Sequence, residues 1–370
     1  MTLIEQILVI TAVALALVSA TMLVVVLRQM RHHRAEVDEL RQLARAIGAD
    51  GTAERVDYSI ERIGVVMNPS KFHDVDEFRQ RVRDVVAAAE GATVGFYDTT
   101  RADPGRGQAQ QALEDGCDLV FAAGGDGTVR MVAGVLAGSE ARMAIIPSGT
   151  GNLLARNLGV PLDRPESAVL AALAGRDRRI DVGWLRTGMS AQEAEQAPRD
   201  VFLVIAGYGA DAEMIGYTDP AMKARIGWFA YVFGGLRTVL GRGQDVTVTL
   251  PSGDVHRIRA RTVLVGNVGK LPGGFVLMPD AGIDNGVFEV LVAGWRSAAG
   301  FSQVLTQVVS PRLVGGPKIS TMERFLTPSV RVSTPRPQPV QLDGDTEHEA
   351  THLIADIEPR SLLLRVPARD

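Results

Sequence analysis

An uncharged, apolar run lies near the N-terminus of the chain. Ile7–Leu27 contains no charged residue and consists mostly of Leu, Val, Ile and Ala. As a helix, this run would extend roughly 30 Å at about 1.5 Å per residue, which matches the hydrocarbon core of a bilayer. A signal peptide is the alternative, but the basic residues Arg28, Arg31 and Arg34 follow the run instead of preceding it. We therefore expect a single transmembrane anchor within residues 1–30, with the rest of the chain in the cytoplasm.

A second segment, residues 31–60, connects this run to the remainder of the chain. Arg34–Ile47 carries apolar residues at a heptad-like spacing, which predicts a short juxtamembrane helix. Ala49–Ser59 is polar and contains Gly51, a composition typical of a linker.

From residue 61 to residue 186, short apolar runs alternate with amphipathic stretches. After the run Ile63–Met67, for example, Val75, Phe78 and Val82 recur at helical spacing. The pattern predicts strands at 63–67, 92–97, 118–123 and 143–146, and helices at 75–89, 107–113, 129–136, 152–158 and 167–173. Strands that alternate with helices indicate a doubly wound α/β domain, in which helices cover both faces of a parallel sheet.

Strand-like runs separated by glycines and prolines dominate residues 187–370. They lie at 201–205, 246–250, 261–265, 287–292, 330–333 and 362–366. This pattern predicts an all-β domain, an antiparallel β-sandwich or barrel, whose last strand could return to the first domain. Two segments interrupt the strands: residues 188–199 are polar and predict a surface loop, and Ala221–Leu240 includes a helical candidate.

The length and composition of the chain exclude some classes of protein. A chain of 370 residues is long enough for two domains with separate cores. Its formal net charge of −4 argues against binding to nucleic acid, which normally requires a basic surface. The single cysteine, Cys117, excludes an internal disulfide and a zinc site of several cysteines, and it fits a reducing compartment.

Two glycine-rich loops, each between a predicted strand and a predicted helix, carry the strongest chemical signal. Gly124-Gly125-Asp126-Gly127-Thr128 follows one strand, and Pro147–Asn152 follows the next. Glycines let backbone N–H groups approach an anion, and the following helix N-terminus adds partial positive charge. Both loops would lie at the carboxyl edge of a parallel sheet and could converge on one crevice. Asp126 would repel a phosphate there unless a metal or a hydrogen-bond network intervenes, which suggests Mg²⁺; tight structural turns are the alternative.

A third motif points to different chemistry. His348-Glu349-Ala350-Thr351-His352 matches the H-E-x-x-H pattern of zinc proteases, which requires a helix so that both histidines share one face. Here the segment lies between Asp343-Gly344 and the apolar run 353–357, a pattern that predicts a turn and a strand. We therefore interpret this match as chance.

Taken together, the motifs resemble the diacylglycerol kinase catalytic-domain superfamily, which includes bacterial lipid kinases, sphingosine kinases and ceramide kinases. The resemblance covers roughly residues 63–366. It is carried, in chain order, by Asn68-Pro69, Gly124-Gly125-Asp126-Gly127-Thr128, Pro147–Asn152, Arg179–Gly183, Gly207–Ala212, Pro279–Gly286 and Leu342–Asp345. Seven elements in the right order make a specific match.

The resemblance implies an enzyme that transfers the γ-phosphoryl group of ATP to a lipid hydroxyl, with Mg²⁺ as cofactor. It implies that Asp343 is the general base and that Asp126, Asp181 and Asp284 organise the magnesium. The residues implied to contact the nucleotide are Asn68, Pro69, Gly124, Gly125, Asp126, Gly127, Thr128, Ser148, Gly149, Thr150 and Asn152. Without the resemblance, Asp343-Gly344 is also typical of a hairpin turn.

Diacylglycerol is the expected acceptor, because the motif set most resembles the bacterial diacylglycerol kinases. Sphingoid bases, ceramides and other membrane lipids stay open as acceptors. The second domain would bind the lipid, and the apolar cluster Ile226–Phe233 could line its cleft. A transmembrane anchor would hold such an enzyme at the bilayer that contains its substrate. A homodimer is a further expectation from the fold.

The chain also departs from the family pattern. Ser70-Lys71-Phe72-His73 replaces a glycine-rich run, Leu153 replaces an acidic residue, and Asn285 replaces an aspartate. These departures motivate one alternative, a membrane-anchored nucleotide or lipid sensor without catalysis. NAD kinase is a second alternative, because it shares the GGDGT loop and a β-rich second domain. However, Pro147–Asn152 lacks the N-x-G-x-x-G-F-L motif expected of that enzyme.

Overall fold

The computed structural model describes residues 60–87, 92–209, 243–270, 276–295, 300, 303–304 and 320–368. All the described residues belong to one compact unit, Val56–Asp370. The predicted juxtamembrane segment, the helical candidate Ala221–Leu240 and the apolar cluster Ile226–Phe233 lie outside the described residues.

The predicted single-pass membrane location needs correction. In the described part of the chain, no helix is long and apolar enough to cross a membrane. The helix α2, Val75–Ala87, has 13 residues and carries charged side chains, whereas a bilayer requires about 20 apolar residues. The run Ile7–Leu27, on which the prediction of an anchor depended, lies outside the described residues.

A parallel sheet forms the first half of the described chain. Its strands are β1 (Arg62–Met67), β2 (Thr93–Asp98), β3 (Leu119–Gly124) and β4 (Arg142–Pro147). They lie in the order β2-β1-β3-β4, and every neighbouring pair is parallel. Because the order reverses between β1 and β3, the carboxyl edge near these two strands is where ligands bind in sheets of this type.

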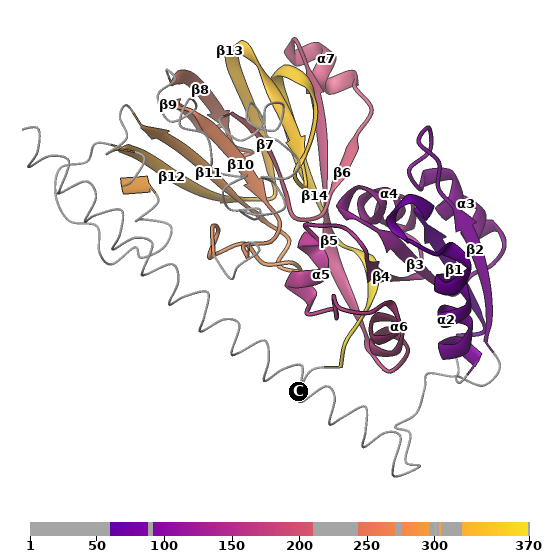
Figure 1. The fold of residues 1–370 in the computed structure, drawn as a ribbon. Coiled ribbons are helices and arrows are strands. Elements are labelled where there is room, and N and C mark those ends of the chain that lie inside the picture. Colours follow the sequence, from indigo (N-terminus) through magenta and orange to yellow (C-terminus); the bar gives the residue numbers. More distant parts are fainter. Residues whose placement is uncertain are drawn as a thin grey trace, which may run out of the picture. The chain divides into compact units, whose positions relative to one another are not determined.

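Helices cover both faces of this sheet (Figure 1). Besides α2 they are α3 (Arg106–Glu114), α4 (Asp126–Leu136), α5 (Leu153–Leu158) and α6 (Pro165–Leu173). Alternate strand residues explain the two layers: Ile63 and Val65 pack with α2 and α6, whereas Val66 packs with α3 and α4. The predicted doubly wound α/β architecture is therefore confirmed.

The second half of the chain is an antiparallel β-sandwich. Its strands are β5 (Arg176–Gly188), β6 (Asp200–Phe202), β7 (Ile205–Gly209), β8 (Gln244–Thr249), β9 (Val255–Ala260), β10 (Thr262–Gly266), β11 (Phe288–Trp295), β12 (Ser320–Thr327), β13 (Ser329–Leu342) and β14 (Asp345–Val366). Buried side chains of these strands, among them Phe202, Tyr208, Phe288 and Val340, form one apolar cluster. The predicted sandwich is confirmed.

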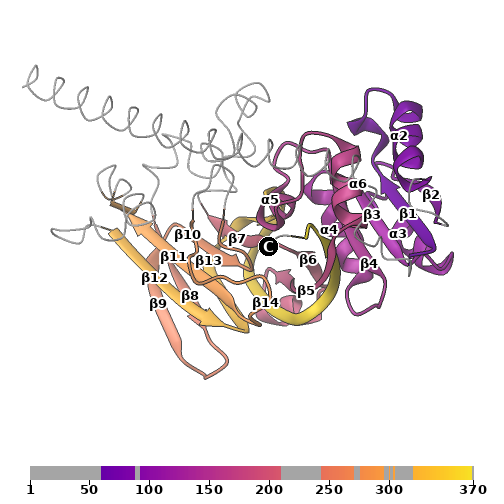
Figure 2. The same cartoon turned by 90° about the horizontal axis from the view of Figure 1, so that it is seen from below.

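Two long strands continue from the sandwich into the α/β part. β14 pairs with β13 near its start and with β5 over most of its length, and Leu364 then lies beside Met143 of β4 in parallel. Figure 2 shows β14 (yellow) curving from the sandwich toward β4. The last strand therefore contributes to both parts of the fold.

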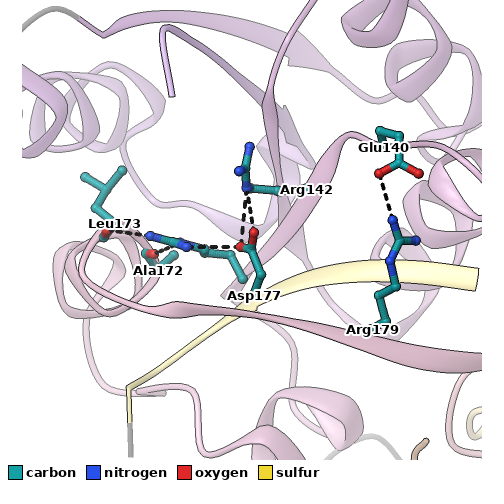
Figure 3. A network of polar contacts seen from close by, with 7 residues as sticks. Glu140, Arg142, Ala172, Leu173, Asp177 and Arg179 are labelled. Carbon is teal, nitrogen blue, oxygen red and sulfur yellow. Dashed lines mark hydrogen bonds and ion pairs between the residues drawn. The ribbon is translucent and has the colours of Figure 1, made fainter. Parts of the chain in front are cut away.

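A charged network fixes the end of β14 (Figure 3). The Asp177 carboxylate of β5 accepts hydrogen bonds from Arg142 of β4 at 3.0 and 3.3 Å and from Arg365 of β14 at 3.0 Å. Arg365 also donates to the carbonyl oxygens of Ala172 and Leu173 at the end of α6, at 2.9 and 3.2 Å. This network joins three strands and a helix at the edge where β4 begins, opposite the glycine loops.

The structure differs from the predicted elements in three respects. The predicted strand 201–205 is divided into β6 and β7, because the N–H groups at the division bond to a side chain instead of a neighbouring strand. The predicted loop 188–199 contains the helix α7, Ala191–Gln196, whose N-cap Ser190 accepts from the N–H of Glu193. The strands β9 and β12 were not predicted.

The H-E-x-x-H segment lies within β14, as a strand instead of a helix. Residues four apart in a strand are separated by roughly 13 Å, which is too far for both histidines to bind one zinc ion. His348 Nε2 instead lies 2.5 Å from the hydroxyl of Thr187 on β5. The interpretation of this motif as a chance match is confirmed.

Candidate active site

The two glycine loops touch each other at the carboxyl edge of the parallel sheet. The N–H of Ser148 donates to the carbonyl of Gly124 at 3.0 Å. A Cβ atom on Gly149 would lie only 2.7 Å from the Cα atom of Gly125, closer than such atoms ever come. The backbones can approach this closely because position 149 is a glycine, whereas a Cβ atom on Gly125 would meet Gly149 at an ordinary 3.4 Å. The predicted convergence of the two loops is thus observed.

Asp126 joins the loops by capping the helix that follows the second one. Its carboxylate accepts hydrogen bonds from the N–H groups of Asn152 at 2.9 Å and Leu153 at 2.6 Å, at the start of α5. The pKa of Asp126 is raised to about 6: burial and the nearby carboxylates of Asp343 and Asp345 raise it, and these N–H groups lower it. Three carboxylates from distant parts of the sequence therefore lie close enough to interact.

The N-terminus of α4 presents backbone donors beside this group. The helix has Gly125 as its N-cap, and hydrogen bonding within it starts with the N–H of Val129, which donates to Gly125 at 3.1 Å. The N–H groups of Asp126, Gly127 and Thr128 consequently have no acceptor within the helix, and they favour an anion. Ser148 belongs to the second glycine loop. Its hydroxyl oxygen is buried and has no hydrogen-bond partner among the described residues.

The remaining residues predicted to contact the nucleotide shape the loops. Asn68 follows β1, and its side-chain oxygen accepts from the N–H and the hydroxyl of Ser70 at 3.1 and 2.7 Å, while Pro69 begins a 3₁₀ turn, Pro69–Lys71. The side chain of Asn152 bonds the N–H and the carbonyl of Gly149 at 3.0 and 2.8 Å. Thr150 is exposed at the tip of the second loop. Asn68 and Asn152 therefore hold the loop backbones in shape.

Asp343 lies in the tight turn between β13 and β14. Asp343 and Gly344 both have positive φ, 50° and 93°, the conformation of a type I′ hairpin turn. The Asp343 carboxylate accepts three backbone hydrogen bonds: Oδ1 from Val204 and Ile205 at 2.8 and 2.9 Å, and Oδ2 from Leu203 at 2.9 Å. The carboxylate offers about four acceptor positions, so one on Oδ2 has no donor among the described residues.

Opposing effects act on the charge of Asp343. Burial raises its pKa, whereas the guanidinium of Arg130 and the N–H groups of Ile205, Leu203 and Val204 lower it. The side chain is 5 % exposed. A buried carboxylate with one open acceptor position can take a proton from a group that reaches Oδ2.

Arg130, one turn after Asp126 on α4, connects this helix to the Asp343 turn. The buried guanidinium donates to the carbonyl of Leu342 at 2.8 Å and to Glu347 at 2.9 Å, and it lies 3.6 Å from Asp345. It therefore supplies positive charge among the carboxylates of the site. The side chain also ties the α/β part directly to the hairpin that carries Asp343.

The three predicted magnesium ligands do not form one group. The Asp181 carboxylate is fully buried and accepts from the N–H groups of Gly286 at 2.6 Å and Arg360 at 2.8 Å. Asp284 pairs with Arg178 at 2.7 Å. In the described ranges, no three His, Cys, Asp or Glu side chains are arranged to hold a metal ion. Asp181 thus fastens a bulge of β14 to the loop before β11, and Asp284 is engaged in an ion pair.

A cavity of about 760 Å³ extends beside α4. It is lined by the loop before α3, by the first residues of α3, and by Met131, Gly134 and Val135 of α4. Met131 follows Asp126 by five residues, which corresponds to about 7.5 Å along a helix. The cavity therefore starts roughly one and a half helical turns from the glycine loops.

Sequence reasoning missed several residues of this site. Arg130 and the bend Leu203–Ile205 belong to no recognised motif, and their contacts reach across 138 to 217 positions of the chain. Arg156 of α5, which donates to the carbonyl of Gly151 at 2.7 Å, also places a cation beside the second loop. Of these residues, only Arg156 could have been found from the sequence, because it is a basic residue in the first turn after the second loop.

Known protein families match both parts of the chain. Residues 62–185 match the family described as "Diacylglycerol kinase catalytic domain". Residues 203–366 match the family described as "YegS C-terminal NAD kinase beta sandwich-like domain". The two matches correspond to the α/β part and the sandwich.

Individual relatives agree with these families. The "Diacylglycerol kinase" of Bacillus subtilis (strain 168) is 26% identical over 296 residues, which cover 78% of this chain and 90% of the relative. A Pseudomonas putida protein named "Probable lipid kinase YegS-like" is 30% identical over 263 residues, covering 70% of this chain and 80% of the relative. A crystal structure of a diacylglycerol kinase from Bacillus anthracis str. Sterne shares the fold, with a TM-score of 0.62, 23% identity and coverage of 83% and 97%.

Proposed function

Because the chain belongs to the diacylglycerol kinase catalytic-domain superfamily and is an enzyme of the lipid kinase type, we propose that it phosphorylates the hydroxyl group of diacylglycerol with ATP. The products would be phosphatidic acid and ADP. The observation that carries the proposal is the meeting of Asp126, Asp343 and Asp345 beside the glycine loops. It combines an anion-binding helix terminus with a buried carboxylate in one site.

The glycine loops bind the phosphates of ATP. The N–H groups of Asp126, Gly127 and Thr128 point out of the first turn of α4, and the hydroxyl of Ser148 supplies a further donor.

Asp343 is the general base. Its open acceptor position on Oδ2 receives the proton of the lipid hydroxyl while the hydroxyl oxygen attacks the γ-phosphorus and ADP leaves. The three N–H groups of residues 203–205 fix the carboxylate in one orientation, so the position of Oδ2 is set before the lipid arrives. Arg130 balances the negative charge that accumulates around this step.

The chemistry of the site also fits a magnesium ion. Asp126 and Asp345 are carboxylates that lie near each other and near Asp343, and such like charges attract a divalent cation. One or two carboxylates suffice, because magnesium in kinases is held largely by substrate phosphates and water. When bound with ATP, the ion would neutralise charge on the transferred phosphoryl group. Asp181 and Asp284 take no part in this assignment.

Transfer of labelled γ-phosphate in mixed micelles tests the proposal. The purified protein would be incubated with ATP, Mg²⁺ and one lipid at a time: diacylglycerol, a sphingoid base, a ceramide or a long-chain polyprenol. We expect product with diacylglycerol that disappears in Asp343→Ala and persists in Asp254→Ala, a control at an exposed aspartate in the β8–β9 turn. Transfer to another lipid alone would overturn the choice of acceptor. Nucleotide binding without transfer to any lipid would favour the sensor alternative.

A further inference from the structure

The peptide segment Leu203–Val204, between β6 and β7, is held from two sides. On one side its N–H groups, together with that of Ile205, donate to the carboxylate of Asp343. On the other side its carbonyl oxygens accept hydrogen bonds from Asn267, which directly follows β10, and the N–H of Val268 also donates to the carbonyl of Val204, at 3.3 Å. The segment that orients Asp343 is therefore itself positioned by Asn267.

Asn267 makes these contacts with two different groups. Its backbone N–H donates to the carbonyl of Val204 at 2.9 Å, and its side-chain Nδ2 donates to the carbonyl of Leu203 at 3.0 Å. The second hydrogen of Nδ2 goes to the carbonyl of Asp181, also at 3.0 Å. Both partners of the amide are carbonyl oxygens, which accept only, so the nitrogen must face them.

The environment leaves little choice of side chain. Asn267 is 0 % exposed, and its Oδ1 atom is buried without a hydrogen-bond partner among the described residues. The side chain is thus held through its two N–H donors alone. An aspartate has nearly the same shape but no such donors, and its charge would face the two carbonyl oxygens.

We propose that Asn267 is a positioning residue for Asp343, acting through the carbonyl side of the Leu203–Val204 peptides. Because a peptide unit is planar, fixing its carbonyl oxygen also fixes the direction of the N–H group of the same unit. The carbonyl of Leu203 shares its peptide unit with the N–H of Val204, and the carbonyl of Val204 shares its unit with the N–H of Ile205. Those are the two N–H groups that bond Oδ1 of Asp343. This inference rests on the proposed role of Asp343 as general base.

Two substitutions separate positioning from general stability. Asn267→Asp keeps the shape and removes both side-chain donors, and Asn267→Ser keeps one donor on a shorter side chain. Gln244→Ala, at a buried polar residue on β8, is the matched control for damage to the sandwich. Turnover of each protein would be divided by the number of nucleotide-binding sites, measured by titration, so that unfolded molecules do not lower the result.

We expect a loss in kcat with little change in KM for ATP. Normalised kcat should fall about a hundredfold in Asn267→Asp and about tenfold in Asn267→Ser, because small displacements of a reacting group cost that much. Gln244→Ala should keep the normalised kcat of the wild type. Equal normalised kcat in the wild type and Asn267→Ser would overturn the proposal, and so would an equal loss in Gln244→Ala.

Amide hydrogen exchange provides a readout that does not depend on activity. The amides of residues 203–205 should be protected in the wild type and exchange much faster in both Asn267 variants, while Gln244→Ala leaves them protected. Unchanged protection in Asn267→Ser would contradict the inference even if no lipid substrate were found. Conversely, faster exchange at 203–205 combined with full turnover of Asp343→Ala would support the geometry and reject Asp343 as the base.

Discussion

The glycine loops and the Asp343 turn meet in one site but are built in opposite ways. Asp126 bonds to N–H groups 26 and 27 positions later in the chain, within one strand–helix–strand–helix segment. Asp343 bonds to N–H groups 138 to 140 positions earlier, and Arg130 reaches a carbonyl 212 positions away. The loops are thus formed by local sequence, whereas the turn depends on the whole sandwich being folded.

This difference has a functional consequence. Changes in the glycine loops should act mainly on nucleotide binding, because their contacts stay within the α/β part. Changes around Asp343 should act on turnover and folding together, because the same hydrogen bonds orient the carboxylate and close the fold. Four substitutions test this division, and they are given in order of expected effect.

Asp343→Asn should have the largest effect. The amide keeps the size of the side chain and tolerates the positive φ of this position, so the turn itself is not strained. However, its NH₂ group would face at least one of three backbone N–H donors, and the unfolding free energy should fall by about 3 kcal/mol. Turnover should fall at least a hundredfold. Chemical denaturation and the transfer assay would measure both, and a stable, active variant would contradict the structural role of the charge.

Arg130→Met should come next. The substitution retains a long apolar side chain but leaves the buried carbonyl of Leu342 and the carboxylate of Glu347 without their donor. We expect a decrease of about 2 kcal/mol in unfolding free energy and a loss of about tenfold or more in kcat. Arg331→Met, at an exposed ion pair with Glu195, is the control and should change stability by less than about 1 kcal/mol. Equal effects of the two substitutions on stability and kcat would contradict the role of Arg130 in supporting the Asp343 turn.

Gly149→Ala tests the contact between the loops. The new Cβ atom would lie 2.7 Å from Gly125, so the two loops must separate. KM for ATP should rise about tenfold, and the normalised kcat should change far less. Gly95→Ala on β2 is the control, because its Cβ would meet only ordinary contacts of 3.4 Å or more. A change in kcat alone would contradict the assignment of these loops to the nucleotide.

Ser148→Ala should have the smallest effect, and it should separate nucleotide binding from stability most clearly. The hydroxyl has no hydrogen-bond partner among the described residues, so its removal should leave the unfolding free energy within about 0.5 kcal/mol. If it contacts a phosphate, KM for ATP should rise about fivefold, as expected for one hydrogen bond. Calorimetric titration with ATP or a non-hydrolysable analogue would detect the change. Unaltered affinity would exclude Ser148 from the nucleotide contacts.

The same division explains what the sequence could predict. The strands and helices of the α/β part were recognisable, because their apolar residues follow regular periods and glycine loops mark the ends of β3 and β4. The sandwich was recognised as a class, but the division of 201–205 into β6 and β7 was not predictable. That division depends on the carboxylate of Asp343, and the sequence near residue 203 contains no pattern that predicts this contact.

The predicted site residues show the same contrast. Sequence reasoning proposed the glycine loops and Asp343 as site residues from motifs that are short and contiguous. It grouped Asp181 and Asp284 with Asp126 as metal ligands, but their partners are Gly286, Arg360 and Arg178. A motif shows that a carboxylate is present, whereas the donors that surround it come from strands elsewhere in the chain.

The most direct test compares nucleotide affinity and turnover in Asp343→Ala and the wild type. Both proteins would be titrated with ATP and then assayed for phosphoryl transfer to diacylglycerol, with turnover expressed per nucleotide-binding site. Our account predicts affinities within about threefold of each other and a loss of at least a hundredfold in turnover. Turnover close to that of the wild type would contradict Asp343 as the base, and a parallel loss of nucleotide affinity would contradict the separation of the two regions.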